Sequence, residues 1–224
     1  MMPSSYHRRL NFGTTDATRF TPELGADVLA HLATIASFAL ENMVNRARLV
    51  RSGLTDVLTG WHNRRYLQDR LREELARARR DRLSLCCLLL DVDFFKRIND
   101  QFGHLAGDRV LRELAQRIES QVRGSDMAAR YGGEEFVLLL PATQVDDAVD
   151  LANRIRAAVS DTPITIDPQN AATITVSIGV SSCLPDEYEQ DLKTVAEALL
   201  AAADVAMYKA KSAGRDCVKT ADEP

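Results

Sequence analysis

The sequence predicts an α/β sandwich, in which helices pack against a mixed β-sheet. Segments with helical and strand-like periodicity alternate along most of the chain. One stretch, "SDMAARYGGEEFVLLLP", is typical of two strands around a Gly-Gly turn, and such strands form an antiparallel hairpin. Strands that are separated by helices favour parallel pairing, so the sheet is expected to contain both kinds. These signals indicate the ferredoxin-like or palm-type architecture, with the hairpin at its centre.

Each helix and strand is predicted from the pattern of apolar and charged residues in its own segment. The segment "NRRYLQDRLREELARARR" has the apolar stripe of a surface helix, and "LSLCCLLLDVD" is an apolar strand bounded by charge. Two helices with a turn at Gly103 are expected in "FFKRINDQFGH" and "LAGDRVLRELAQRIESQVR". After the hairpin come a helix in "VDDAVDLANRIRAAVSD", a strand in "AATITVSIGVSSC", a long helix in "DLKTVAEALLAAADVAMYKAKSAG" and a strand in "RDCVKT". From the first core strand onward the predicted order is β-α-α-β-β-α-β-α-β.

Four parts are expected along the chain. Residues 1–21 form a flexible lead-in, 22–53 a long helix, 54–220 the folded domain and 221–224 a tail. The long helix has apolar residues at alternating steps of four and three, with polar residues at two seam positions. Two interpretations remain open for it, a dimerising stalk or a helix packed on its own domain.

Composition narrows the class of protein. The net charge of −4 provides no basic field for non-specific nucleic-acid binding, so DNA is not an expected partner. No apolar run approaches the ~20 residues of a membrane helix and no signal peptide is recognised, so we expect a cytoplasmic protein. The four cysteines include no CxxC pair, which favours buried thiols in a reducing compartment over a zinc site or disulfides.

Two acidic clusters suggest a metal site. Asp91 and Asp93 follow the first core strand, and Glu134 and Glu135 follow the glycine pair of the hairpin. Mg²⁺ prefers oxygen ligands, commonly one or two carboxylates together with substrate phosphates. Asp91 and Glu134 are the expected metal pair, although an isolated DxD is more often a solvated strand end.

The neighbouring residues suggest phosphate binding. Gly132 and Gly133 would let a phosphate approach the backbone closely. Lys96, Lys211 and Arg215 would supply positive charge to a triphosphate, although the last two also have the positions of ordinary helix-capping cations.

Five sequence stretches, which include these residues, resemble the motifs of a known family. They are "DVLTGWHNRR", "DVDFFKRINDQFGHLAGD", "RYGGEEF", "SIGV" and "ADVAMYKAKSAGRD". In order and spacing they resemble the GGDEF family of bacterial diguanylate cyclases, over about residues 54–220. The resemblance implies a palm-like fold and the synthesis of cyclic di-GMP from two GTP molecules, with release of two pyrophosphates.

The resemblance also implies roles for individual residues. Asp91, the Val92 carbonyl and Glu134 would bind Mg²⁺, two ions per site, with Mn²⁺ as an alternative. Glu134 would also accept the proton of the attacking 3′-hydroxyl, and Glu135 would support the turn or the metal shell. At the phosphoryl oxygens the implied contacts are Lys96 and the backbone amides of Phe94 and Phe95. Guanine would be bound by Asn99 and Asp108, with His104 nearby. The other phosphate contacts would be Lys211 and Arg215.

Guanine selection, dimerisation and inhibition follow from the same resemblance. A carboxylate at Asp108 accepts from N1–H and the exocyclic amine of guanine, whereas adenine has no donor at N1, so GTP is expected over ATP. One domain holds one GTP, so catalysis requires a homodimer. Arg123 and Asp126 in "RGSD" resemble the family's RxxD product-inhibition site, although an isolated RxxD is by default a surface ion pair.

Three departures and two alternatives accompany this prediction. Glu134 replaces the family's usual Asp, Trp61 replaces a usual leucine, and "FTPELGADVLAHLATIASFALEN" resembles the closing helix of a GAF-like sensor domain. The alternatives to an active enzyme are a nucleotide receptor without turnover and a purely structural dimerisation partner.

Overall fold

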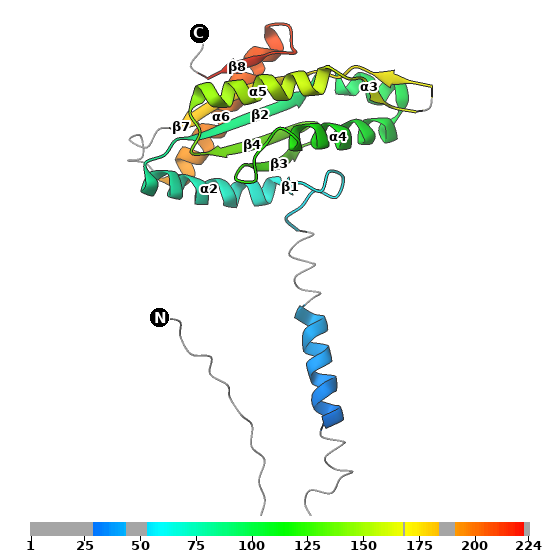
Figure 1. The fold of residues 1–224 in the computed structure, drawn as a ribbon, viewed down its shortest axis with the longest axis vertical. Helices are drawn as coiled ribbons and strands as arrows, with labels where there is room; N and C mark the ends of the chain where they lie inside the picture. Colours follow the sequence, from blue (N-terminus) through cyan, green and yellow to red (C-terminus); the bar gives the residue numbers. More distant parts are fainter. Residues whose placement is uncertain (1–28, 44–52, 168, 184–190, 222–224) are drawn as a thin grey trace, which may run out of the picture. The chain divides into compact units, whose positions relative to one another are not determined.

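The computed structural model describes residues 29–43, 53–167, 169–183 and 191–221, in two compact units, Met1–Val50 and Arg51–Pro224. The described part of the first unit is a helix over residues 29–43 (Figure 1). Its apolar side chains are exposed, including Leu29, Leu32, Ile35, Phe38, Leu40 and Met43. The expected lead-in, the ends of the long helix and the tail at 222–224 lie outside the described residues.

A six-stranded mixed sheet forms the second unit (Figure 1). Its strand order is β1-β3-β4-β2-β7-β8. The strands are β1 (His62–Asn63), β2 (Leu85–Val92), β3 (Met127–Gly132), β4 (Glu135–Pro141), β7 (Val176–Cys183) and β8 (Val218–Thr220). The helices are α2 (Arg64–Asp81), α3 (Phe95–Phe102), α4 (His104–Glu119), α5 (Val145–Ser160) and α6 (Leu192–Ser212). A separate small hairpin pairs β5 (Ile164–Thr165) with β6 (Ala171–Ala172).

The pairing confirms the predicted fold class. Strand β2 pairs antiparallel with both β4 and β7, and β3 pairs antiparallel with β4. The outer strands β1 and β8 pair in parallel with β3 and β7. The core order β2-α3-α4-β3-β4-α5-β7 is a ferredoxin-like arrangement, with two helices in its first crossover.

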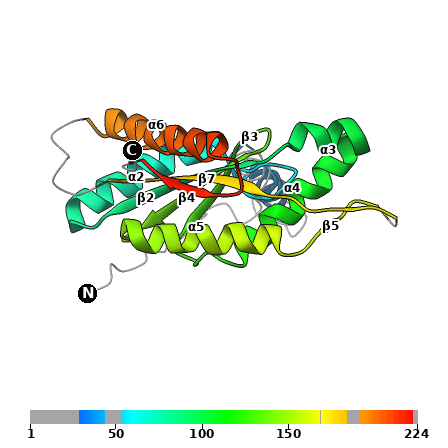
Figure 2. The same cartoon turned by 90° about the horizontal axis from the view of Figure 1, so that it is seen from above.

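Helices cover both faces of the sheet (Figure 2). Helices α2 and α6 lie on one face, and α4 and α5 lie on the other. All eight residues of β2 are buried, and alternate side chains enter the two hydrophobic clusters. Leu88 and Leu90 pack in the cluster with α4 and α5, whereas Leu85 and Leu89 pack in the cluster with α2 and α6. Burial on both faces makes β2 the rigid centre from which the site extends.

The four cysteines are free thiols. Cys86, Cys87 and Cys183 are buried, and Cys217 is half-buried. Burial raises the pKa of Cys86 and Cys87 to about 12, which suppresses the reactive thiolate. Among the described residues, no helix combines the length and the apolar content needed to span a bilayer.

Short elements differ from the sequence prediction. Strands β1 and β5 were not predicted, and the strand expected in "AATITVSIGVSSC" is divided into β6 and β7. Asn63 precedes α2 as its cap, with its side chain accepting from the Tyr66 N–H at 3.1 Å. Two-residue strands lack the periodicity on which sequence prediction rests.

Candidate active site

Three elements meet at the carboxyl end of β2. Asp91 is paired with Glu135 of β4 on one side and with Ser177 of β7 on the other. The Val92 N–H donates to the backbone carbonyl of Glu134 at 3.3 Å, so the hairpin turn is attached to the strand end. The third element is the end of α6, from which Lys211 Nζ reaches Asp91 Oδ2 at 2.8 Å.

Burial, and then mutual repulsion, disfavour the ionised carboxylates at this point. Burial raises the pKa of Asp91, against the lowering effect of Lys211. Burial, followed by the charge of Asp91, raises the pKa of Glu134 and of Glu135. Lys211 acts on all three groups but does not reverse these shifts. A further cation here would therefore be bound favourably.

The donor set fits a Mg²⁺ ion that is completed by substrate. Asp91 and Glu134 would supply carboxylate oxygens, and the Val92 N–H is bonded to the Glu134 carbonyl. Within the described ranges, no three His, Cys, Asp or Glu side chains are grouped to enclose an ion by themselves. Mg²⁺ commonly takes one or two carboxylates and leaves its other positions to water and phosphate. The arrangement therefore suits an ion that arrives with a nucleotide.

Arg130 holds the hairpin turn. Its Nη2 and Nε donate to the Gly133 carbonyl at 2.6 and 3.1 Å. Its Nη1 forms an ion pair with Asp56 at 3.1 Å. Burial opposes ionisation of Asp56, but hydrogen bonds from Thr59 and the contacts with Arg130 lower its pKa overall. The turn that presents Glu134 is thus fixed from outside the hairpin.

The glycine pair has two different environments. A Cβ added at Gly132 would lie 2.9 Å from Glu135 Oε2, so the missing side chain makes room for that carboxylate. A Cβ at Gly133 would meet open space. Neither residue has the positive φ that would require glycine. The space beside Gly133 is consistent with the close approach of a ligand.

The expected basic groups come from α3, from the end of α6 and from the segment after it. Lys96 is exposed in the first turn of α3. Arg215 follows α6, and its guanidinium carbon is 4.5 Å from the centroid of the Phe94 ring. Arg97 stacks on the same ring at 4.5 Å. Both cations contact the same aromatic ring, whose face attracts positive charge.

The expected guanine-binding residues come together where α3 meets α4. A Cβ added at Gly107 would lie 2.0 Å from Asn99 Oδ1, so the Asn99 side chain covers the residue next to Asp108. The same Cβ would lie 2.9 Å from Phe95 Cζ. Asp108 is half-buried and His104 is exposed at the start of α4. Gly107 therefore permits the close contact between the two helices.

Comparison with known proteins shows the family of this chain. Residues 53–217 match the family model described as diguanylate cyclase, GGDEF domain. The chain belongs to the GGDEF family. The response regulator PleD of Caulobacter vibrioides is 46% identical over 166 residues, which are 74% of this chain and 35% of that protein. Diguanylate cyclase A of Treponema denticola is 38% identical over 197 residues, 86% of this chain and 50% of that protein. The chain thus spans half or less of these relatives.

Solved structures of GGDEF domains share the fold. The coiled coil and GGDEF domain of DgcB from Caulobacter crescentus, in complex with c-di-GMP, has a TM-score of 0.78 at 29% identity. That match covers 86% of this chain and 98% of the other. The active GGEEF domain of a diguanylate cyclase from Vibrio cholerae has a TM-score of 0.65 at 38% identity, covering 72% and 98%. This chain therefore contains a diguanylate cyclase GGDEF domain with a palm-like fold.

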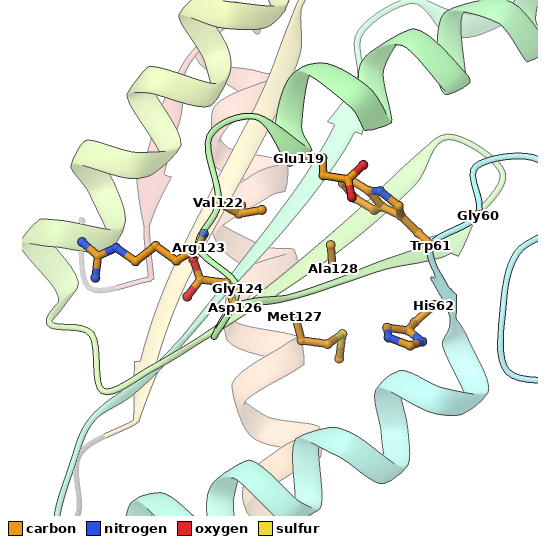
Figure 3. Close-up of a pocket in the computed structure, with 10 residues that line it drawn as sticks. All are labelled: Gly60, Trp61, His62, Glu119, Val122, Arg123, Gly124, Asp126, Met127 and Ala128. Atoms are coloured by element: carbon orange, nitrogen blue, oxygen red, sulfur yellow. Dashed lines mark hydrogen bonds between the residues drawn. The ribbon is translucent and has the colours of Figure 1, made fainter.

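In this GGDEF domain the RxxD residues form the turn between α4 and β3. The Arg123 N–H donates to Asp126 Oδ2 at 2.9 Å, and the Asp126 N–H donates to the Arg123 carbonyl at 3.0 Å. The turn borders a pocket of about 350 Å³, drawn in Figure 3. Trp61, His62 and Glu119 line that pocket, and the Arg123 side chain points away from them (Figure 3). The arginine is exposed and not held in an ion pair with Asp126.

Trp61, the departure from the usual leucine, is part of the core. It is buried, and its ring meets the ring of Phe136 edge to face, with centroids 5.5 Å apart. The larger residue thus packs against β4 without disturbing the sheet order.

Sequence reasoning missed several residues that shape the site. Asp56, Arg130 and Gly107 lie inside the quoted motifs, but no role was assigned to them. The motif positions were an available signal, whereas the partners are far apart in sequence and follow from the fold. Asp93 was expected to belong to the acidic cluster that suggested a metal, yet it bonds to other protein groups, as described below.

Proposed function

We propose that this domain condenses two GTP molecules into cyclic di-GMP and releases two pyrophosphates. The observation that carries the proposal is the meeting of Asp91, Glu134 and Lys211 at the end of β2. Each 3′-hydroxyl attacks the α-phosphorus of the other GTP, forming a P–O bond while the bond to pyrophosphate breaks. Positioning and charge stabilisation account for most of such a reaction.

The acidic residues have separate tasks in this proposal. Asp91, the Val92 carbonyl and Glu134 would hold Mg²⁺, which when bound would supply positive charge beside the phosphates and the attacking hydroxyl. Glu134 accepts the proton that leaves the 3′-hydroxyl. Glu135 remains beside Gly132 and supports the turn.

The basic residues receive the triphosphate. Lys211, which lies 2.8 Å from Asp91 Oδ2, would contribute its positive charge to a phosphate. Arg215 provides a planar guanidinium for phosphate oxygens. Lys96 and the amides of Phe94 and Phe95 stabilise charge at the reacting phosphoryl group.

The guanine base binds where α3 meets α4. Asp108 accepts hydrogen bonds from N1–H and the exocyclic amine, with Asn99 and His104 beside it. ATP lacks the N1 donor and leaves the carboxylate unsatisfied, so GTP is preferred.

The active species is a homodimer with two-fold symmetry. One domain supplies one GTP site, whereas the product joins two nucleotides, so two domains face each other. The helix over residues 29–43 carries exposed apolar side chains that a second copy would cover. Arg123 and Asp126 bind the product and limit the reaction, because the exposed guanidinium is available to a phosphate or a guanine face.

The experiment is incubation of the purified chain with GTP and Mg²⁺, followed by chromatographic separation of nucleotides. The expected result is one cyclic di-GMP for every two pyrophosphates, with a rate that rises more than linearly at low protein concentration. A chain that binds cyclic di-GMP but forms no product at high protein concentration is a receptor instead. Glu134→Ala is the control, because it removes the proton acceptor and leaves the RxxD turn intact.

A further inference from the structure

We propose that Asp93 is a positioning residue, which fixes the Arg215 guanidinium where the triphosphate binds. The inference deepens the proposed function and rests on it. Asp93 lies two residues beyond Asp91 and resembles a second metal ligand in sequence. Its contacts assign it to a different task.

Asp93 joins three segments of the chain. Its side chain is buried, with 5% exposure. Its Oδ1 accepts from the Ser177 hydroxyl at 2.7 Å, and its Oδ2 accepts from the Thr175 hydroxyl at 2.8 Å and from the Asp216 N–H at 3.0 Å. Both carboxylate oxygens therefore accept hydrogen bonds from the protein. Such bonds to an ionised group are among the stronger ones in proteins.

The Asp216 contact holds the turn that carries Arg215. Arg215 and Asp216 have φ angles of 69° and 44°, in the left-handed region that residues with a side chain rarely adopt. Such a backbone persists where its surroundings fix it. The turn is attached at three further points: the Arg215 N–H donates to Ala210 O at 3.1 Å, Arg156 pairs with the Asp216 carboxylate at 3.0 Å, and the Cys217 carbonyl accepts from the Ile178 N–H at 3.0 Å.

Phe94 provides a second connection between the same segments. It follows Asp93 directly and also has a left-handed backbone, with φ at 57°. The guanidinium carbon of Arg215 lies 4.5 Å from the centroid of the Phe94 ring. The buried carboxylate thus fixes both the turn from which Arg215 extends and the loop whose ring supports its guanidinium. Because Asp91 lies on the same rigid strand end, Asp93 sets the separation between the metal-binding carboxylate and the phosphate-binding arginine.

This arrangement predicts a selective defect. Asp93→Asn keeps the size of the side chain but removes its charge, so the hydrogen bond from the Asp216 N–H loses its charge assistance. The turn would shift and Arg215 would lose its alignment with the phosphates. The guanine-binding residues lie on α3 and α4 and not on the turn, so binding of the base is expected to change less than binding of the phosphates.

The test measures equilibrium binding of two ligands, a non-hydrolysable GTP analogue with Mg²⁺ and guanosine, which has no phosphate. Asp93→Asn is expected to weaken analogue binding about tenfold, as for the loss of one charge-assisted hydrogen bond, and to change guanosine binding less than about twofold. Ser177→Ala, which removes one donor and keeps the carboxylate, produces a smaller loss in the same direction. Asp81→Asn, an exposed carboxylate paired with Arg80, is the matched control and leaves both affinities unchanged.

A double-mutant cycle with Arg215→Ala separates positioning from general structural damage. If Asp93 acts through Arg215, Asp93→Asn causes no further loss of analogue affinity in the Arg215→Ala background. Three results would overturn this inference alone. The losses of analogue affinity in the double-mutant cycle could be additive, or guanosine affinity could fall as much as analogue affinity. The third is unchanged analogue affinity in both Asp93→Asn and Ser177→Ala. Wild-type protein that binds neither ligand would overturn the proposed function together with it.

Discussion

Arg130 forms an ion pair with Asp56 at 3.1 Å and, through the same guanidinium, donates to the carbonyl of Gly133 at 2.6 Å. The turn that presents Glu134 is therefore attached to the segment that precedes the sheet. A change in that segment would be transmitted to the catalytic turn through two side-chain contacts.

Asp56→Asn is expected to lower kcat about tenfold or more, because small displacements of reacting groups slow catalysis strongly. The pKa of Asp56 is lowered in the folded state, so its ionised form contributes stability above the unfolded-state pKa. The variant should therefore also lower Tm by about 3 °C at neutral pH. Steady-state assays and thermal melts measure both effects. Asp69→Asn breaks an exposed ion pair with Arg72 and serves as the control. Equal effects of the two substitutions would contradict the role of Asp56.

Glu134→Gln is expected to abolish turnover and to stabilise the metal-free protein. Burial and Asp91 raise the pKa of Glu134, so its ionised form is less favourable in the folded state. The substitution removes that charge at a partly exposed site, and the expected rise in Tm is about 2 °C. Thermal melts without metal test this, and a lower Tm for the variant would contradict it.

The same shift predicts a pH dependence. A carboxyl with a raised folded-state pKa binds its proton more tightly when folded, so stability falls as pH rises from the unfolded to the folded pKa. The stability advantage of Glu134→Gln over wild type should therefore grow as pH rises through that window and then level off. Chemical unfolding of both proteins without metal at several pH values measures the difference. If the stability advantage of Glu134→Gln shrinks as pH rises, the pKa of Glu134 is lowered on folding and not raised.

The sequence predicted the fold class and the central hairpin because long elements have clear periodicity. The eight apolar-rich residues of β2 and the 21 residues of α6 are examples. The convergence of Asp91 with Glu134 was also predictable, since a strand end and a hairpin turn share one edge. Contacts such as Asp93 with Asp216 were not predictable, because they join residues 123 apart that only the folded sheet brings together. The short strand β1 was missed for lack of any pattern.

Gly107→Ala is expected to weaken GTP binding about tenfold and to reduce the preference for GTP over ATP. The added methyl group would lie 2.0 Å from Asn99 Oδ1 and would displace that side chain from beside Asp108. Because a lost hydrogen bond to the base changes affinity by about this factor, competition binding with both nucleotides can measure it. An unchanged ratio of GTP to ATP affinity would contradict the placement of guanine at the α3–α4 junction.

Arg123→Ala is expected to raise the cyclic di-GMP concentration needed for half-maximal inhibition about tenfold or more. The reason is that a charge-assisted contact with the product is lost. The arginine is exposed and its side chain does not close the turn, so folding should be unaffected. Initial rates with added cyclic di-GMP measure the effect. Arg72→Ala, on α2, is the control, and unchanged product sensitivity of Arg123→Ala would remove the RxxD assignment.

The most direct measurement is the position of a divalent ion in crystals of the chain with a GTP analogue. Mn²⁺ in place of Mg²⁺ would locate the ion by its anomalous scattering. The ion is predicted to lie between Asp91 and Glu134, with Lys211 moved from Asp91 to a phosphate oxygen. An ion bound elsewhere, or Lys211 still paired with Asp91 while the nucleotide is bound, would contradict the account.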